Sequence, residues 1–197
     1  ADMMLREDEV DYDVIRQAKI FHFGTLSMTD EPVRSATKKA LEVAKEAGCL
    51  ISLDPNLRPP LWKSLDEAKK MMEYGFRYCD ILKISDNEIQ FVTGKEDYDE
   101  GIRCLQEKYQ IPLILLTMGK EGSRVLTDKE DIKVEALKVN AVDTTGAGDT
   151  YIGYFVRGIV EEMPLLETAQ MATKASAIAV TRFGAVDSIP NYEEVFE

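Results

Sequence analysis

The sequence predicts an α/β protein built on a mostly parallel sheet. Short apolar runs, typical of buried strands, alternate along the chain with longer segments whose apolar residues recur at helical spacing. Strands joined through helices in this way form parallel, right-handed crossover units. Near the end, a glycine turn joins two strands without a helix, which favours an antiparallel edge. The length of 197 residues leads us to expect a single α/β domain over residues 1–197.

The elements of the first part follow from apolar patterning. The runs expected as buried strands are residues 19–24, 49–53, 80–85 and 111–117. The segments expected as helices are a short surface helix within 7–18, then 31–48, 64–76, a helix containing Ile89, and 97–109. Gly48 illustrates the end signals, because a glycine just past the last apolar position commonly ends a helix.

The pattern changes in the last part of the chain. A glycine turn at residues 118–122 precedes a strand expected at 123–127, and alternating residues predict one more short strand at 132–136. The remaining segments are a helix from the loop at Gly146 to about residue 162, an alanine-rich helix over 165–181, a loop over 182–188, and the end of the chain. Small residues in the alanine-rich helix permit close packing against a neighbour.

Composition and charge exclude several classes of protein. Hydrophobic residues make up 45% and charged residues 30%, as in ordinary globular proteins, and no run of about 18 apolar residues predicts a membrane span. The formal net charge of −12 argues against nucleic acid and anionic membranes as partners. Cys49, Cys79 and Cys104 are scattered in apolar settings, which indicates reduced core thiols. With an N-terminus that lacks a signal-peptide core, this predicts a cytoplasmic protein.

The only histidine, His22, lies inside an apolar run. We expect a core or substrate-edge histidine there rather than a metal ligand. No Ser/His/Asp or Cys/His machinery is recognisable, and there is no G-x-x-x-x-G-K-[ST] phosphate loop. Hydrolases of the triad type and P-loop enzymes are therefore disfavoured.

A stiff loop, Asp54-Pro-Asn-Leu-Arg-Pro-Pro-Leu-Trp62, follows the second strand. Its prolines forbid regular structure, and the carboxyl ends of parallel strands are where α/β proteins bind ligands. Asn56 and Arg58, with Asp54, are therefore candidates to point into a site. The alternative is a proline-rich turn with an aspartate cap.

Acidic residues meet the same edge of the sheet in Ser85-Asp-Asn-Glu88. Such residues can hold water around a magnesium ion, which keeps several waters and takes few protein ligands. The alternative is that Ser85 or Asp86 caps the following helix. For this motif taken alone, the helix cap is the favoured interpretation.

The strongest candidate for chemistry is Asp143-Thr-Thr-Gly-Ala-Gly-Asp149. Three small residues stand where the loop turns into a helix: Gly146, Ala147 and Gly148. Small residues let an anion approach the unbonded N–H groups of a helix start. Asp149 falls in the first turn, where its carboxylate suits the role of base in phosphoryl transfer to a hydroxyl. The alternative is a helix start capped by Thr144 or Thr145.

Four ordered stretches together resemble the ribokinase-like (pfkB) carbohydrate kinases, and among them the fructokinases. Residues 143–149 closely match the family's C-terminal signature, and residues 54–62 resemble the fructokinase loop after the corresponding strand. Residues 116–122 are similar to the family's nucleotide-binding turn, and residues 177–185 look like its closing loop. The resemblance implies a ribokinase-like three-layer α/β/α fold.

The resemblance also implies roles for residues. Asp149 would be the general base, and the anion hole for the transferring phosphoryl group would be formed by the amides of Gly146, Ala147 and Gly148. The positions that match nucleotide contacts are Thr117, Gly119, Gly122 and Gly148. Arg58 and Asn56 match positions near substrate or phosphate, and Glu88 matches a glutamate linked indirectly to magnesium, although Ser85 replaces the family's asparagine. The positions that match a monovalent cation site, usually potassium, are Asp143, Thr145, Ala179, Arg182, Gly184 and Ser188.

The chain departs from the family at its start. The family's first strands, its β lid and most of its sugar contacts have no counterpart here, so the chain resembles the C-terminal two-thirds of such a kinase. The neighbours of missing strands would expose a sheet edge and apolar surface. A homodimer or a second chain would cover that surface, or the sequence is an excerpt of a longer protein.

The resemblance therefore predicts ATP-dependent phosphorylation of a sugar hydroxyl, with conversion of fructose to fructose 6-phosphate as the first candidate. ATP, Mg²⁺ and K⁺ are the expected nucleotide and cofactors, and the sugar and ATP are the expected partners. Two alternatives stay open. One is a ribokinase or nucleoside kinase of the same family, and the other is a non-catalytic nucleotide-binding remnant or interaction protein.

Overall fold

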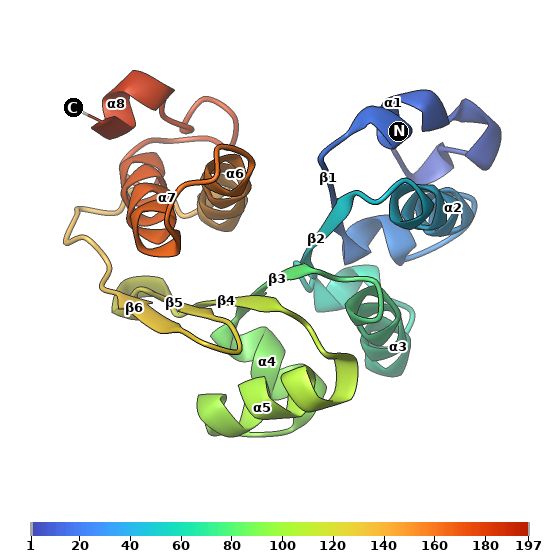
Figure 1. Cartoon of the computed structure of the whole chain (residues 1–197), viewed down its shortest axis with the longest axis horizontal. Helices are drawn as coiled ribbons and strands as arrows, with labels where there is room; N and C mark the ends of the chain where they lie inside the picture. Colours follow the sequence, from blue (N-terminus) through green and yellow to red (C-terminus); the bar gives the residue numbers. More distant parts are fainter. Residues whose placement is uncertain (1, 197) are drawn as a thin grey trace. The chain divides into compact units, whose positions relative to one another are not determined.

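The computed structural model describes residues 2–196, which form two compact units. One unit extends to Ile114 and the other begins at Leu115, so the boundary lies within strand β4 (Leu113–Thr117). Six strands form a sheet in the order β1-β2-β3-β4-β5-β6 (Figure 1). The β1–β2 and β2–β3 pairs are parallel, and β5 and β6 are antiparallel. The predicted α/β class, with a mostly parallel sheet and a late antiparallel edge, is confirmed.

The first unit alternates strands and helices as the patterning predicts. Its strands are β1 (Ile20–Gly24), β2 (Leu50–Asp54) and β3 (Ile81–Ser85). Its helices are α1 (Tyr12–Gln17), α2 (Val33–Glu46), α3 (Leu65–Phe76), α4 (Asp86–Thr93) and α5 (Tyr98–Tyr109). Its 3-10 turns are η1 (Asp2–Met4), η2 (Glu7–Glu9), η3 (Thr25–Met28) and η4 (Pro59–Leu61).

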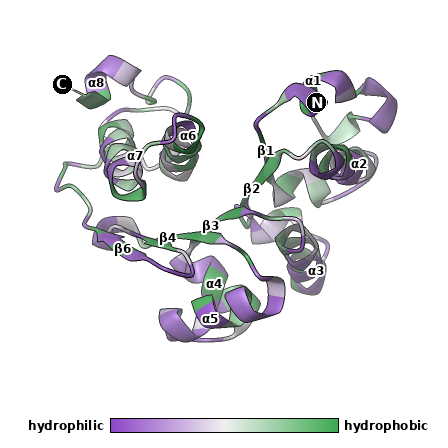
Figure 2. Ribbon diagram, viewed as in Figure 1, coloured by the Kyte–Doolittle hydropathy of each residue, from purple (hydrophilic) through white to green (hydrophobic). Residues whose placement is uncertain are grey.

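Apolar side chains of β2 and β3 form the core of the first unit. Ile51, Leu53 and Leu82 are fully buried, and β3 stands out as hydrophobic in Figure 2. Helix α3 approaches the sheet closely, because a Cβ placed on Gly75 would lie 2.9 Å from Cδ2 of Leu53. Protein interiors are close-packed, so a larger residue at position 75 would force α3 away from the strand.

The second unit places two long helices beside a short antiparallel pair of strands. Its elements are η5 (Gly119–Glu121), β5 (Ser123–Leu126), β6 (Asp131–Val134), α6 (Ala147–Val160), α7 (Leu165–Ala179) and α8 (Tyr192–Phe196). Helices α6 and α7 lie side by side (Figure 1). A Cβ on Gly158 would lie 2.6 Å from Cγ2 of Thr168, so the absence of a side chain permits this approach. The close packing expected of the alanine-rich helix is confirmed.

Several elements differ from the sequence-based expectation, mostly by one or two residues at their ends. The helix expected within residues 7–18 divides into η2 and α1, because Asp11 caps α1 by accepting from the N–H groups of Asp13 at 3.0 Å and Val14 at 3.2 Å. Helix α7 ends at Ala179 rather than residue 181. Helix α8 was not predicted.

The cysteines and the histidine agree with expectation in part. All three cysteines are free, and burial, followed by the charge of Asp80, raises the pKa of the Cys79 thiol. His22 is exposed, and its Nδ1 lies 3.0 Å from Oγ of the buried Ser52, so it is not a core residue. Within residues 2–196, no cluster of His, Cys, Asp and Glu side chains is arranged to hold a metal ion. None of the described helices has the length and apolar character needed to cross a membrane.

Candidate functional site

Residues 143–149, here called the cradle, form the turn that leads into α6. Gly146 is the N-cap residue, and its φ of +76° lies in the left-handed region that favours glycine. Its carbonyl accepts from the Thr150 N–H at 2.8 Å. No side chain caps the helix, so the alternative in which Thr144 or Thr145 is the cap is wrong. Asp149 is exposed in the first turn, as predicted.

Asp143 joins the cradle to the segment after α7. Its Oδ1 accepts from the N–H of Thr145 at 2.9 Å, and its Oδ2 accepts from the N–H of Gly184 at 3.1 Å. These hydrogen bonds, with that from Thr145 first, lower the pKa of the Asp143 carboxyl. A carboxylate that accepts backbone N–H bonds is stabilised in its charged form. As a charged carboxylate, Asp143 therefore connects the cradle to the segment after α7.

Residues 180–191 connect α7 to α8 and are here called the C-terminal loop. The Val180 carbonyl accepts from the N–H groups of Val142 at 2.7 Å and Asp143 at 3.2 Å. The hydroxyl of Ser188, which is fully buried, donates to the Ala185 carbonyl at 2.8 Å. Of the residues expected around a monovalent cation, the structure therefore joins Asp143 directly to Thr145 and Gly184, while Arg182 donates its N–H to the Ala179 carbonyl at 3.0 Å.

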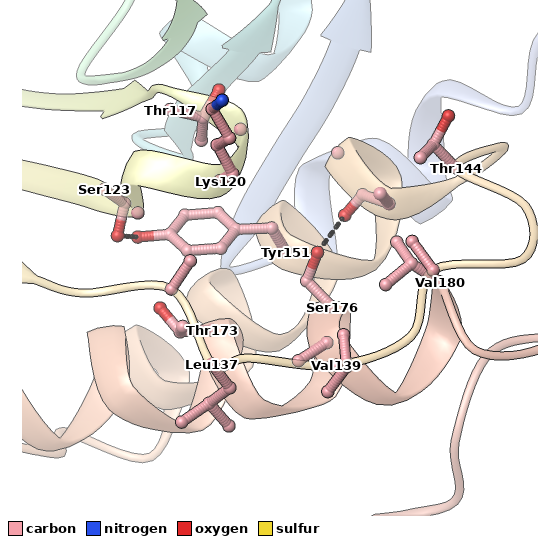
Figure 3. A pocket seen from close by; sticks show the side chains of 17 residues that line it. Thr117, Lys120, Ser123, Leu137, Val139, Thr144, Tyr151, Thr173, Ser176 and Val180 are labelled. Carbon is pink, nitrogen blue, oxygen red and sulfur yellow. Dashed lines mark hydrogen bonds between the residues drawn. The ribbon is translucent and has the colours of Figure 1, made fainter.

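A cavity of about 400 Å³ lies in the second unit, beside the start of α6 (Figure 3). Its lining residues include Thr117, Gly119, Lys120, Gly122, Ser123, Leu137, Val139, Thr144, Ala147, Gly148, Tyr151, Thr173, Ser176 and Val180. The four residues expected around a nucleotide, namely Thr117, Gly119, Gly122 and Gly148, all line this one cavity. The lining also includes Ala147, so the cavity reaches the cradle.

Gly122 is required by the backbone around this cavity. Its φ is +99°, and a Cβ there would lie 2.1 Å from the Val134 carbonyl oxygen. No other residue type avoids that overlap, because every other residue carries a Cβ. The Gly122 carbonyl also accepts from the Met118 N–H at 2.9 Å, which closes the turn.

Several lining residues were not predicted from the sequence. Tyr151 is buried, and its hydroxyl donates to Oγ of Ser123 at 3.0 Å. Burial raises the pKa of Tyr151 to about 12, so the ring stays neutral at physiological pH. Ser176 donates to the Ala147 carbonyl at 3.0 Å (Figure 3). The available signal was periodicity, since the lining residues on α7 and at its C-cap recur three or four positions apart: Thr173, Ser176, Ala177 and Val180.

In the first unit, Asp54 and Lys83 form a buried ion pair. Nζ of Lys83 lies 2.9 Å from Oδ2 of Asp54, and the two side chains are 8% and 5% exposed. Oδ1 of Asp54 accepts from the N–H of Asn56 at 3.2 Å. Asn56 has a φ of +49°, a left-handed conformation that asparagine tolerates. Asp54 thus shapes the loop from inside.

Glu88 connects the same loop to helix α4. Its Oε1 accepts from the Leu57 N–H at 2.7 Å, and its Oε2 accepts from both the N–H and the hydroxyl of Ser85, each at 2.8 Å. Ser85 and Glu88 form a capping box, so the helix-cap interpretation of this motif is confirmed. Arg58 follows with an exposed side chain whose Nη1 donates to the Leu57 carbonyl at 3.2 Å.

Comparison with known proteins gives consistent matches. The family model described as pfkB family carbohydrate kinase matches residues 1–192. The chain is 42% identical over 202 residues to "Probable fructokinase-4" of Arabidopsis thaliana, a match that covers 99% of this chain and 62% of that protein.

Two solved structures share the fold. A fructokinase from Vibrio cholerae O395, solved in a fructose, ADP and calcium ion bound form, is 29% identical with a TM-score of 0.90. The match covers 100% of this chain and 65% of that one. A putative ribokinase II from E. coli, in complex with ATP and Mg²⁺, is 26% identical with a TM-score of 0.90, over 98% of this chain and 62% of that one. The chain therefore spans less than two thirds of each of these relatives.

Proposed function

The chain belongs to the pfkB family of carbohydrate kinases, and on that premise we propose that it is the nucleotide-binding and catalytic portion of an ATP-dependent sugar kinase. The observation that carries the proposal is the cavity lined by Thr117, Gly119 and Gly122 that reaches Gly148 at the start of α6. A nucleotide bound there would present its phosphates to the N–H groups of the helix start, where the dipole favours anions.

We assign the chemical step to Asp149 and the cradle amides. Asp149 takes the proton from the sugar hydroxyl as the oxygen attacks the γ-phosphorus of ATP. The bond from that phosphorus to the bridging oxygen of the β-phosphate breaks, and ADP leaves. The amides of Gly146, Ala147 and Gly148 donate to the oxygens of that group, whose charge is redistributed in the transition state. The small side chains and the left-handed Gly146 support this role, because they leave room for an anion at the helix start. The Ala147 N–H donates to the Thr144 carbonyl at 3.2 Å, a bond that an incoming phosphate oxygen would replace.

The residues present fit a monovalent cation more directly than they fit a magnesium ion. Asp143 and the C-terminal loop suit a monovalent cation, which we propose to be potassium, because the charged Asp143 carboxylate lies where the cradle and that loop meet. The contributors proposed for it are Asp143, Thr145, Ala179, Arg182, Gly184 and Ser188. When bound, such an ion would offset phosphate charge.

Magnesium fits Glu88 only indirectly. Glu88 is buried, at 7% exposure, and its carboxylate accepts three hydrogen bonds, one from Leu57 and two from Ser85. Its place inside the helix cap therefore conflicts with a direct ligand role. Magnesium bound by ATP keeps several waters and needs few protein ligands. We propose that Glu88 contributes by holding the loop that carries Asn56 and Arg58, which we assign to substrate or phosphate contacts.

Fructose is the first candidate acceptor, giving fructose 6-phosphate, because the compared relatives named above include fructokinases. A coupled assay with ATP and a sugar panel, run beside a calorimetric ATP titration, tests the proposal. Turnover with fructose supports it, and turnover only with ribose or a nucleoside supports a different kinase of the family. ATP binding without turnover of any sugar supports, for this chain, the alternative of a non-catalytic nucleotide-binding protein.

We further propose that the strand β1, at the end of the sheet order, is covered by another polypeptide segment, either in a homodimer or in a longer form of this protein. Its Ile20 and Phe21 are only partly buried, and an unpaired edge is prone to association. Light scattering of the chain distinguishes a dimer from a monomer.

We propose the cytoplasm as the location of the protein, in keeping with its three free cysteines. Cell fractionation tests this proposal.

A further inference from the structure

One ion pair joins Arg182, near the start of the C-terminal loop, to Glu194 of helix α8, which follows the end of that loop. The Arg182 guanidinium donates to both oxygens of the Glu194 carboxylate, with Nη1 at 3.5 Å from Oε2 and Nη2 closer to Oε1. Oε2 of Glu194 also accepts from the N–H of Asn191 at 2.7 Å. Two-point contacts of this kind fix orientation as well as distance. The loop between residues 182 and 191 is thus closed by side chains.

Helix α8 gives Glu194 a fixed support. Val195 is buried against Met171 and Ala175 of α7. The guanidinium of Arg157, on α6, lies 3.7 Å from the ring centroid of Tyr192. A helix of five residues has little stability of its own, so these contacts hold α8 in place. The position of Glu194 is therefore set by α6 and α7.

The other end of the connection reaches the cradle. Gly184, two residues after Arg182, donates its N–H to Asp143, and Asp143 in turn accepts from the N–H of Thr145. The neighbouring Ala185 lies against Gly146, since a Cβ on Gly146 would be 3.5 Å from the Ala185 carbonyl oxygen. A shift of the C-terminal loop would therefore move groups that shape the start of α6.

We propose that Arg182 and Glu194 are positioning residues, which hold the C-terminal loop against the cradle through Gly184 and Asp143. This inference rests on the proposed function only for its effect on ATP binding, which requires that the cradle bind phosphate. Both side chains are 37% exposed, and exposed ion pairs add little to global stability. Their effect is therefore local, on the order of the loop and the geometry of the cradle.

Hydrogen exchange tests the local effect without any assay of activity. In Glu194→Gln, the amide of Gly184 should exchange about two- to fivefold faster than in the wild-type chain, because local opening of the loop no longer has to break the ion pair. Glu193→Gln is the matched control, since Glu193 is the adjacent exposed glutamate of α8. It should leave the exchange of Gly184 unchanged. Arg182→Lys keeps the charge but loses the two-point contact, and should give an intermediate rate.

Calorimetric ATP titration in potassium chloride separates this inference from the proposed function. Weaker ATP binding in Glu194→Gln than in Glu193→Gln, with faster exchange at Gly184, supports the positioning role. Absence of ATP binding by the wild-type chain contradicts the proposed function, while the exchange result still decides whether the ion pair orders the loop. Unchanged exchange at Gly184 in both Glu194→Gln and Arg182→Lys overturns the inference. Arg182→Lys keeps the test decisive if Glu194→Gln does not fold.

Discussion

Lys83 and Asp54 form an ion pair in the interior of the first unit, with Nζ and Oδ2 2.9 Å apart. Taking two charges out of water is costly, and the cost is recovered only while both partners are present. The pair also shapes the loop that carries Arg58, because the second oxygen of Asp54 accepts from the Asn56 N–H.

Replacing Lys83 with Met should therefore destabilise the protein strongly. The change leaves the Asp54 carboxylate buried without its ammonium partner, at an expected cost of about 3–5 kcal/mol in the free energy of unfolding. Urea denaturation measures it. The matched control is Lys39→Met, which removes a lysine from an exposed pair with Glu42 and should cost at most about 1 kcal/mol. Equal losses of unfolding free energy in Lys83→Met and Lys39→Met would show that burial of the Lys83–Asp54 pair does not set the cost.

Replacing Gly122 with Ala should destabilise the second unit and close part of the cavity. The added Cβ would overlap the Val134 carbonyl oxygen, and the positive φ alone is expected to cost about 1–3 kcal/mol. Thermal unfolding and ATP titration measure the two effects. Gly153→Ala is the control, because Gly153 lies in α6 with nothing within 4 Å of an added Cβ. That change should stabilise the helix by roughly 0.5–1 kcal/mol.

Under the proposed function, replacing Asp149 with Asn should lower kcat by about 10²–10⁴-fold, because the proposed general base is lost while the shape of the side chain is kept. The affinity for ATP and the unfolding midpoint should change little, since Asp149 is exposed in the first turn of α6. Asp128→Asn, at an exposed position outside the site, is the control. A kcat close to that of the wild type would remove Asp149 from the role of base.

The contribution of Asp143 to stability should depend on pH in a defined direction. Its pKa in the folded protein is below the ordinary value of 3.8, chiefly through the bond from the Thr145 N–H. A lowered folded pKa stabilises the fold above the unfolded value, and the stabilisation is lost as the pH falls through the folded pKa. The stability difference between wild type and Asp143→Asn, measured by urea denaturation, should be constant above about pH 5 and shrink in acid. A difference that grows in acid would contradict this.

The order of strands and long helices was predictable because it rests on local periodicity, which tertiary contacts reinforce. Short elements were not. Helix α8 has five residues and depends on Val195 packing on α7, information that no local window contains. The expected helix near the start was interrupted because Asp11 caps a helix there, although it lies inside the acidic segment.

The residues of the candidate site show the same contrast between what local sequence predicts and what depends on tertiary packing. Gly146 and Gly122 could be singled out from sequence because small residues mark a helix start at one and a turn at the other, and the structure gives both a positive φ. The partner of Lys83 could not be named, since the pairing depends on the register between β2 and β3. Tyr151 and Ser123 are 28 positions apart and meet only through the packing of α6 beside β5.

The cavity draws every one of its lining residues from one continuous stretch, between Thr117 and Val180. A pocket encoded in this way can be inherited as a block, because no recombination event outside that stretch removes part of its wall. The loop that carries Arg58 lies in a different segment of the chain, so mutation can alter it without altering the pocket. Under the proposed function, contacts to the acceptor sugar can therefore change while the pocket for the phosphate donor stays the same.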